Sequence, residues 1–285
     1  MTEHSMEARL AALTPPLTHD EMAARVARTG AWYWTEAWLT EAKAWAVTVL
    51  GVGIATPVLF LASLGVGLGI VVDSAGGDQA LGMPYARFVA PALLVSAAML
   101  AASQDNTLTV MSGFKWKRTY YGPLVTPLTP QQIVSGHVMG VSFRYVIASA
   151  IYASILMLFQ ATPFPAGFAL IGVGALTAHA IGLPLMAYAS TLAEDKGQFA
   201  LVNRFVIAPM MLFSGTFFPL ESLPIWAQPV GWVSPVWHGT QLGRDLTTPL
   251  SEPAWLMAVH LGYLVLLATV GWWLARRTYR RRLIT

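Results

Sequence analysis

The chain has 285 residues, of which 55% are hydrophobic and 11% are charged. A soluble domain carries about 25% charged residues, so this chain has too few ionisable side chains to coat a water-facing surface. Its charge-poor stretches exceed the roughly 20 apolar residues that a helix needs to cross a bilayer. Cysteine is absent, which excludes disulfides, thiolate catalysis and cysteine metal sites. The composition predicts an all-α membrane protein.

The first 44 residues precede the first long apolar run. Residues 1–30 are rich in charge and lack the apolar centre of a signal peptide, which predicts a cytoplasmic tail. In 31–44, Trp34 and Trp38 are spaced as on one face of a helix, and the polar residues lie elsewhere on the helical wheel. This pattern predicts an N-terminal interfacial helix. A solvated turn that opens the first span is the alternative.

Six apolar segments within a 45–280 permease domain are predicted to cross the membrane. The 49 uncharged residues between Arg144 and Glu194 are too many for one helix, and Pro163 and Pro165 divide them into two. The predicted spans are about 45–70, 87–111, 135–160, 168–192, 201–217 and 254–275.

The proline-rich segment 218–253 could form a seventh span or a short hairpin. With six spans, 14 of the 17 lysines and arginines lie on one side, including the basic cluster at 276–282. A seventh span would move that cluster outside, against the tendency of basic residues to stay in the cytoplasm. We therefore predict six spans, both termini in the cytoplasm, and a re-entrant or surface-lying outer hairpin over 218–237.

Two ionisable residues lie deep in predicted spans, Asp105 in the second and Arg144 in the third. A charge at the centre of a membrane helix costs about 2.5–3.5 kcal/mol on insertion scales, so each needs an explanation. At 1.5 Å of rise per residue, their depths differ by roughly 5 Å, which side chains can bridge. An ion pair that locks the two spans is one prediction. The other is that Arg144 extends to the cytoplasmic interface while Asp105 contacts water.

The 112–134 loop is the longest predicted internal segment on the cytoplasmic side. It begins with basic residues, and Thr129 followed by Pro130 is typical of a helix start. A cytoplasmic ATPase bound to this loop could tilt spans two and three together, although an ordinary connecting loop is the alternative. The predicted ATPase-docking residues are Lys117, Arg118, Tyr120, Tyr121, Leu124, Thr126, Pro127 and Leu128.

Motifs that would give the chain its own chemistry are missing from the sequence. It contains neither the phosphate-binding G-x-x-x-x-G-K-[ST] nor the zinc-binding H-E-x-x-H. Four histidines, at 137, 179, 238 and 260, are scattered over different segments and are predicted to be packing residues. No catalytic, cofactor-binding or metal-binding residue is expected on this chain.

The run FSGTFFPLESLPIW at 213–226, followed by SPVWHGTQLGR at 234–244, resembles the signature of type-two ATP-binding-cassette exporter permeases. Weaker similarities at 65–69, 88–99 and 126–136 point to the branch that contains nodulation lipo-oligosaccharide and daunorubicin-resistance permeases. The resemblance covers roughly 45–280. One departure is Val236–Trp237, where the family often has Leu and a small polar residue.

The resemblance implies a multi-pass protein of the bacterial plasma membrane that exports lipids, lipid-linked glycans or hydrophobic drugs. It implies two permease copies, or this chain and a related permease, joined to two cytoplasmic ATPase subunits. ATP and magnesium would lie on those subunits, which would contact 31–44 and about 115–132. Membrane lipids are expected partners and nucleic acid is not. The short helices at 219–237 would lie at the outer leaflet.

Residues of the predicted outer hairpin could form a gate at the exit. Glu221 could serve this gate, or be a solvated or helix-capping carboxylate. The predicted gate residues are Phe217, Phe218, Pro219, Glu221, Pro224 and Trp226. Two functions of other classes are the alternatives to export. An intramembrane lipid-modifying enzyme would need a catalytic cluster, and an ion-coupled secondary transporter would show two related halves.

Overall fold

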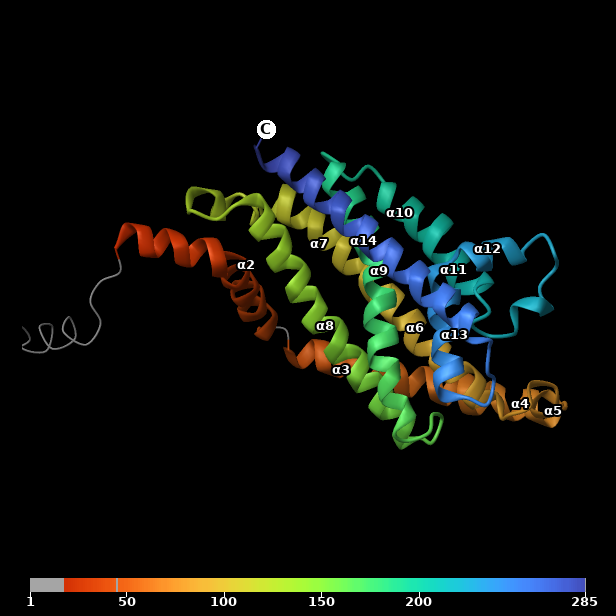
Figure 1. Cartoon of the computed structure of the whole chain (residues 1–285). Helices are drawn as coiled ribbons and strands as arrows, with labels where there is room; N and C mark the ends of the chain where they lie inside the picture. Colours follow the sequence, from red (N-terminus) through yellow and green to blue (C-terminus); the bar gives the residue numbers. More distant parts are fainter. Residues whose placement is uncertain (1–17, 45, 285) are drawn as a thin grey trace, which may run out of the picture.

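The computed structural model describes residues 18–44 and 46–284, and every regular element in these two ranges is a helix (Figure 1). The elements of the N-terminal half are α2 (His19–Lys43), α3 (Ala46–Phe60), η1 (Leu61–Leu68), α4 (Gly69–Ser74), α5 (Gly77–Leu81), α6 (Tyr85–Asn106), α7 (Leu108–Met111), η2 (Ser112–Trp116), η3 (Gly122–Val125) and α8 (Pro130–Leu158). The C-terminal half holds η4 (Ala166–Phe168), α9 (Ala169–Thr191), α10 (Gln198–Val202), η5 (Asn203–Ile207), α11 (Ala208–Phe213), η6 (Leu220–Ser222), α12 (Gln228–Val233), α13 (Pro235–Thr247) and α14 (Ala254–Ile284). Helices α6, α8, α9, α13 and α14 pack against one another as one bundle.

Helix α2 begins at His19, well before the predicted start at residue 31. Thr18 and Glu21 form a capping box in which the Thr18 hydroxyl accepts from the Glu21 N–H and the Glu21 carboxylate accepts from the Thr18 N–H. Such a box satisfies backbone donors that a helix start would leave open. Part of the predicted tail is therefore helical, and residues 1–17 of that prediction lie outside the described residues.

Five helices are long and apolar enough to cross a membrane: Leu50–Ser74, Tyr85–Trp116, Pro130–Leu158, Ala166–Thr191 and Ala254–Ile284. They correspond to predicted spans one to four and six. The predicted fifth span, 201–217, corresponds to the shorter apolar helix Gln198–Phe213. At 1.5 Å per residue these 16 residues extend about 24 Å, less than the roughly 30 Å hydrocarbon core. The total of six crossings, and the cytoplasmic location of both termini, stay predictions.

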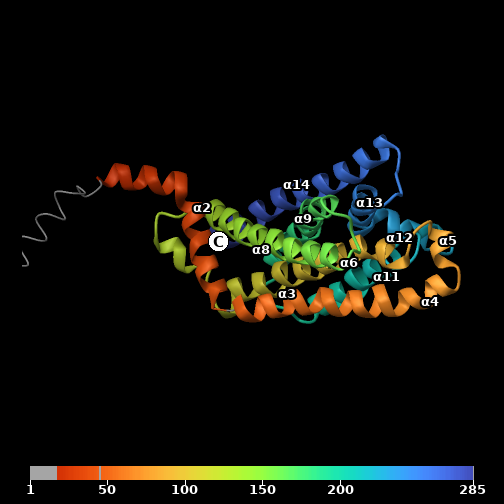
Figure 2. The ribbon, with the colours of Figure 1, turned by 90° about the horizontal axis from the view of Figure 1, so that it is seen from below.

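The first span is built from three pieces that follow one another along one side of the bundle (Figure 2). Pro57 lies inside α3 and has no N–H to donate, and the next segment, η1, is π-helical. A π-helical insertion adds a residue per turn and often marks a functional region. This span is thus interrupted near its middle, unlike the regular α8 and α14.

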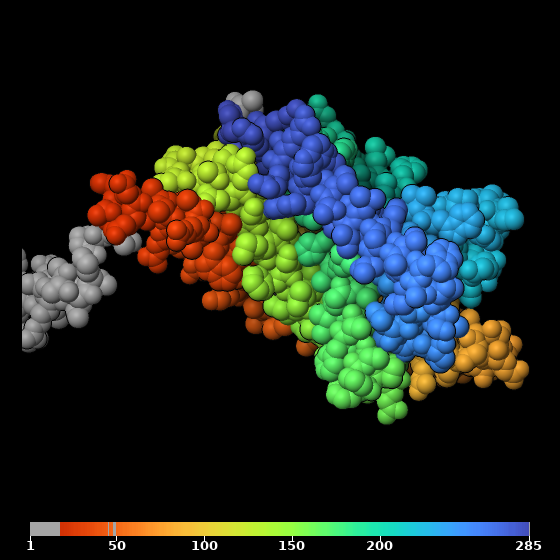
Figure 3. All heavy atoms as spheres, in the orientation of Figure 1, coloured from red at the N-terminus to blue at the C-terminus, as the bar shows by residue number. Residues whose placement is uncertain are grey.

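Helix α9 lies at the centre of the bundle, against α6, α8, α13 and α14. In the space-filling view, α14 crosses the front of α9 (Figure 3). The close approach requires glycine, because a Cβ at Gly271 of α14 would lie 2.5 Å from the backbone nitrogen of Pro184 in α9. Pro184 is itself without an N–H, so backbone packs against backbone at this point.

The predicted outer hairpin, 218–237, ends inside a helix in the structure. η6 and α12 form its first part, but α13 starts at Pro235 and continues to Thr247. Ser234 caps α13 by accepting from the N–H of Val236 at 3.2 Å. Helix α13 packs against α6, α9 and α14 and is largely buried, so it belongs to the bundle core rather than to a surface hairpin.

Candidate functional site

The loop between η2 and α8 is anchored by a cluster of aromatic side chains. Tyr120 is 2% exposed, and its ring lies 4.7 Å from that of Phe114 and 5.2 Å from that of Tyr279, centroid to centroid. Its hydroxyl is 3.2 Å from Nδ1 of His137, and burial raises the pKa of Tyr120. Of the predicted docking residues, Tyr120 is therefore in the core and cannot present its side chain to a partner.

The other predicted docking residues lie at or near the surface of the same loop. Lys117, Arg118, Thr126 and Pro127 are exposed, and Tyr121, Leu124 and Leu128 are half-buried. Val125 at the loop tip is 91% exposed, although no prediction included it. The loop thus presents a short surface of mixed polar and apolar character.

Helix α2 is fixed to α8 immediately beside this loop. The Gln132 side chain donates to the carbonyl of Val26 at 2.8 Å, and the Thr35 hydroxyl donates to the carbonyl of Gly136 at 3.1 Å. A Cβ at Gly136 would lie 2.4 Å from the carbonyl oxygen of Ala31, so the two helices are in backbone contact. A push on α2 or on the loop must therefore move α8.

Two exposed ion pairs connect the loop to neighbouring elements. Lys117 bonds Glu41 of α2 at 2.9 Å, and Lys115 bonds Glu194, after α9, at 2.5 Å. The hydrogen bond and the charge of Lys115 lower the pKa of Glu194. Exposed pairs contribute only about 0–1 kcal/mol, so they orient the loop more than they stabilise it.

Asp105 of α6 and Arg144 of α8 form an ion pair through Oδ1 and Nη1. The Asp105 side chain is 6% exposed, whereas that of Arg144 is 35% exposed. The second carboxylate oxygen of Asp105 is buried and has no hydrogen-bond partner among the described residues. The structure has the ion pair, and the burial of Asp105 does not fit the alternative in which this carboxylate contacts water.

The FSG turn after α11 is held by Arg244 of α13. Its guanidinium donates to the carbonyl of Gly215 at 2.7 Å and to that of Phe88 at 3.1 Å, and it lies 3.7 Å above the Phe88 ring. Gly215 has φ +64°, a conformation that favours glycine. Burial lowers the pKa of Arg244 to about 9, and the nearby charge of Glu221 opposes this change. The guanidinium thus connects the turn to α6.

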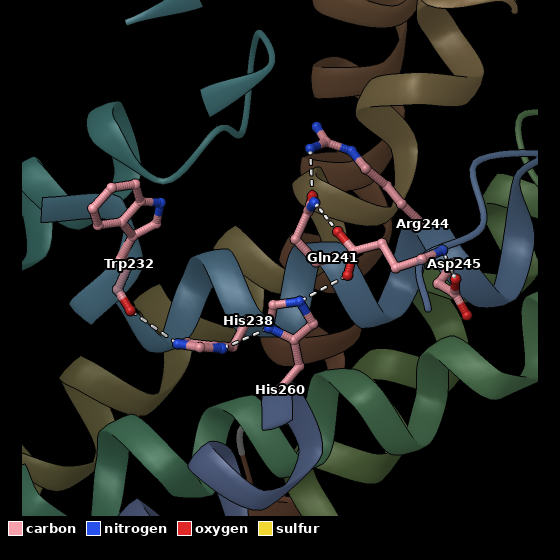
Figure 4. A network of polar contacts seen from close by, with 7 residues as sticks. Trp232, His238, Gln241, Arg244, Asp245 and His260 are labelled. Atoms are coloured by element: carbon pink, nitrogen blue, oxygen red, sulfur yellow. Dashed lines mark hydrogen bonds and ion pairs between the residues drawn. The ribbon is translucent and has the colours of Figure 1, made fainter. Parts of the chain in front are cut away.

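A chain of polar contacts extends from this arginine across α13 to α14 (Figure 4). Gln241 accepts from Arg244 at 3.2 Å and donates to Glu252 at 2.7 Å. The other Glu252 oxygen lies 2.8 Å from Nε2 of His260, whose Nδ1 is 2.7 Å from Nδ1 of His238. The sequence prediction treated these two histidines as unconnected.

The direction of these hydrogen bonds fixes where protons must lie. The Trp232 carbonyl can only accept, so His238 donates to it from Nε2 at 3.0 Å. Nδ1 of His238 then accepts from His260, and a proton between His260 and Glu252 completes the chain. Burial lowers the pKa of His238 to about 4, which keeps this ring neutral at physiological pH.

Sequence spacing contained a signal for this network that the prediction did not use. His238, Gln241 and Arg244 follow one another at intervals of three residues, which places them along one side of α13. Their partners on α14 and on the loop before it could not be found in this way, because that contact depends on how the helices pack.

The predicted gate residues lie around this turn with unequal exposure. Phe218, Glu221, Pro224 and Trp226 are exposed, with Trp226 at 74%, whereas Phe217 and Pro219 are half-buried. The Phe217 carbonyl accepts from the Tyr85 hydroxyl at 3.0 Å, which connects this segment to the start of α6. The exposed members form a surface adjacent to the buried network.

Comparisons with known proteins agree on one family. A sequence model described as ABC-2 type transporter matches residues 35–246. Nodulation protein J of Rhizobium leguminosarum bv. viciae is 28% identical over 260 residues, which cover 88% of this chain and 93% of that protein. Nodulation protein J of Bradyrhizobium diazoefficiens is 27% identical over 93% of this chain and 99% of its own length.

A shorter similarity involves a permease of a different kind. The probable multidrug ABC transporter permease YbhR of Escherichia coli K12 is 28% identical over 177 residues, which cover 58% of this chain and 44% of YbhR. No solved structure matches the chain. Because the family match covers most of its length and the relatives are bacterial, the chain is a multi-pass membrane protein that belongs to the ABC-2 type transporter family.

Proposed function

We propose that this chain is the permease half of an ATP-driven exporter that moves a lipid, a lipid-linked glycan or a hydrophobic drug outward across the bacterial plasma membrane. Two permeases, either two copies of this chain or this chain and a relative, would pair with two cytoplasmic ATPase subunits. Those subunits would bind ATP and magnesium. The family match supports a transport role, and the probable multidrug permease among the relatives supports drug-like cargo.

One structural observation carries the coupling part of this proposal. The exposed 117–128 loop and helix α2 are both fixed to α8, the loop by its aromatic anchor and α2 by backbone contact. An ATPase that contacts both would act on α8 as on a single lever. Helix α8 carries Arg144, whose pairing with Asp105 transmits movement to α6.

The exposed loop residues give a direct test. We expect Pro127→Asp, or Thr126→Arg with Pro127→Asp, to abolish co-purification of the partner ATPase, because these exposed positions add charge to the contact surface without touching the core. Val233→Asp, at an exposed position of α12 distant from the loop in sequence, is the control and should co-purify normally.

Association and coupling can be separated in the same preparation. In proteoliposomes, the wild-type complex should hydrolyse ATP faster than the isolated ATPase, and the loop variants should lose this stimulation. The proposal fails if the wild-type permease neither binds the ATPase nor changes its hydrolysis rate.

A further inference from the structure

A cavity of about 430 Å³ lies between α3, α6 and α8, apart from the outer network and the docking loop. This volume is within the roughly 300–1,000 Å³ range of small-molecule sites. Most of the described residues that line it are aliphatic. On the α6 side the side chains are small, which leaves room for a ligand beside Ala97, Ala98 and Ala101. The lining is therefore mainly apolar, and its polar groups come from Thr56, Gln104, Arg144, Tyr145, Ser149 and Tyr152.

The wall formed by α3 is open rather than packed. An added Cβ at Gly53, which lines the cavity, would have no neighbouring atom within 4 Å. Val52, another lining residue, is 60% exposed, so the cavity reaches the lipid-facing surface of the bundle. The interruption of the first span at Pro57, also in this wall, provides a point where the wall can bend.

Arg144 is the only charged residue among the described residues that line the cavity. It is the fifteenth residue of the 29-residue α8, so it lies near the middle of that helix. A guanidinium has five N–H donors, and Asp105 is its one acceptor among the described residues. At this depth an unused donor is costly, because lipid chains cannot accept hydrogen bonds.

Water is a poor occupant beside the aliphatic part of the lining, because aliphatic side chains offer it no hydrogen-bond partners. An empty volume is also unfavourable, because the lining atoms lose dispersion contacts. A hydrocarbon chain restores those contacts along the aliphatic walls. A polar head attached to that chain can supply the acceptors that Arg144 lacks.

We propose that the α3–α6–α8 cavity binds a single-chain amphiphile, with its chain against the alanines of α6 and a head that accepts hydrogen bonds at Arg144. This inference rests on the proposed export function in one respect: the cavity is where amphipathic cargo is taken from the bilayer. A phosphate head and a glycan head share the required chemistry. A cationic head has no acceptor and is repelled by Arg144.

Binding can be tested on the full-length permease in phosphatidylcholine nanodiscs. The probes are dodecyl chains that carry a diazirine and end in phosphate, maltose or trimethylammonium. We expect saturable photolabelling of α3 and α6 peptides by one or both of the first two probes, and at least tenfold less by the third. Equal labelling by all three would overturn the site, because it would show ordinary lipid contact.

Glycine variants locate the site without disturbing the fold. Gly53→Leu places a side chain in open space inside the cavity and should reduce labelling at least tenfold. Gly51→Leu is the matched control, because its Cβ also meets no atom within 4 Å but Gly51 does not line the cavity. Ala148→Leu fills the cavity from the α8 side and is the second blocking variant. Labelling that persists in both blocking variants would overturn the proposal.

Arg144 variants test the head-group contact. Arg144→Gln with Asp105→Asn removes both charges, and it should weaken the phosphate probe about tenfold while the maltose probe changes less. If both probes label this double variant at the wild-type level, Arg144 does not contact the head group.

The role in cargo uptake has a separate readout. In the permease–ATPase complex, the bound probe should stimulate ATP hydrolysis at least twofold in wild type and in Gly51→Leu, but not in Gly53→Leu. If the complex forms and the probe binds without stimulation, the uptake role is wrong while the binding site stands. If no complex forms, the proposed export function fails, and labelling alone decides the site.

Discussion

Arg144 and Arg244 are both arginines inside a charge-poor bundle, but their surroundings differ. Arg244 is 4% exposed and donates to backbone carbonyls of α6 and of the FSG turn, with an aromatic ring below it. Arg144 has a carboxylate partner, yet its side chain is 35% exposed and borders a cavity. Most N–H groups of the Arg244 guanidinium thus have hydrogen-bond acceptors within the folded chain. The Arg144 guanidinium keeps N–H groups that a ligand can use.

This difference shows why charge pairing alone is a poor guide to function. A buried arginine can be stabilised by carbonyls and an aromatic face, with no carboxylate in direct contact, and it then acts as a structural connector. An arginine that is neutralised but incompletely hydrogen-bonded is the better candidate for binding. Sequence reasoning singled out Arg144 and gave Arg244 no role beyond its place in the family signature.

The largest expected effect is at Arg244. Arg244→Gln should lower the free energy of unfolding by about 3 kcal/mol or more, because each buried carbonyl left without a donor costs about 1–3 kcal/mol. Reversible unfolding in mixed micelles measures this change. Arg276→Gln, exposed on α14, is the control and should stay within about 0.5 kcal/mol of wild type. Equal losses in the two variants would contradict the connector role.

A smaller effect is expected at the other arginine. Arg144→Gln alone should cost about 1–3 kcal/mol, because it leaves the Asp105 carboxylate buried without a cation. Adding Asp105→Asn should recover at least half of that loss, since a neutral amide needs no counter-charge. If the double variant is no more stable than Arg144→Gln, the pair does not couple α6 to α8.

The network beyond Arg244 predicts a pH dependence. Burial lowers the pKa of His238 in the folded chain to about 4, below the ordinary value for histidine, so the unfolded chain takes up a proton first as the pH falls. Stability from this group is therefore complete above about pH 6.5 and is lost progressively as the pH falls toward 4. In the His238→Gln variant, the free energy of unfolding should therefore change less between pH 6.5 and pH 4 than it does in wild type. A curve identical to wild type would show that His238 does not titrate on unfolding.

The smallest expected effect concerns an exposed pair. Lys117→Ala removes the contact with Glu41, but both side chains are more than half exposed, so stability should change by less than about 0.5 kcal/mol. Thermal unfolding of this variant next to Glu41→Ala and the double variant gives the coupling energy. A coupling above about 1 kcal/mol would mean that the loop is held to α2 by charge rather than by packing.

Much of the fold could be predicted from composition, because a bilayer imposes long apolar helices wherever charge is missing. Five predicted spans have a matching long helix, with boundaries shifted by a few residues at most ends. The fifth predicted span, 201–217, has only the shorter apolar helix Gln198–Phe213 as its counterpart. The predicted span continues to 217, but the helix ends at Phe213, before the turn at Ser214 and Gly215, and Arg244 donates to the carbonyl of Gly215.

The sequence by itself determined the membrane class, the apolar helices and the family, because each depends on residue types along the chain. Tertiary structure decided which residues meet: His238 with His260, Arg244 with the FSG turn, and Tyr120 with Tyr279 inside the core. It also decided that Gly53 faces open space beside Arg144. Such contacts join residues distant in sequence, and they depend on helix rotation and spacing, which hydrophobic periodicity does not specify in a chain that is apolar on all sides.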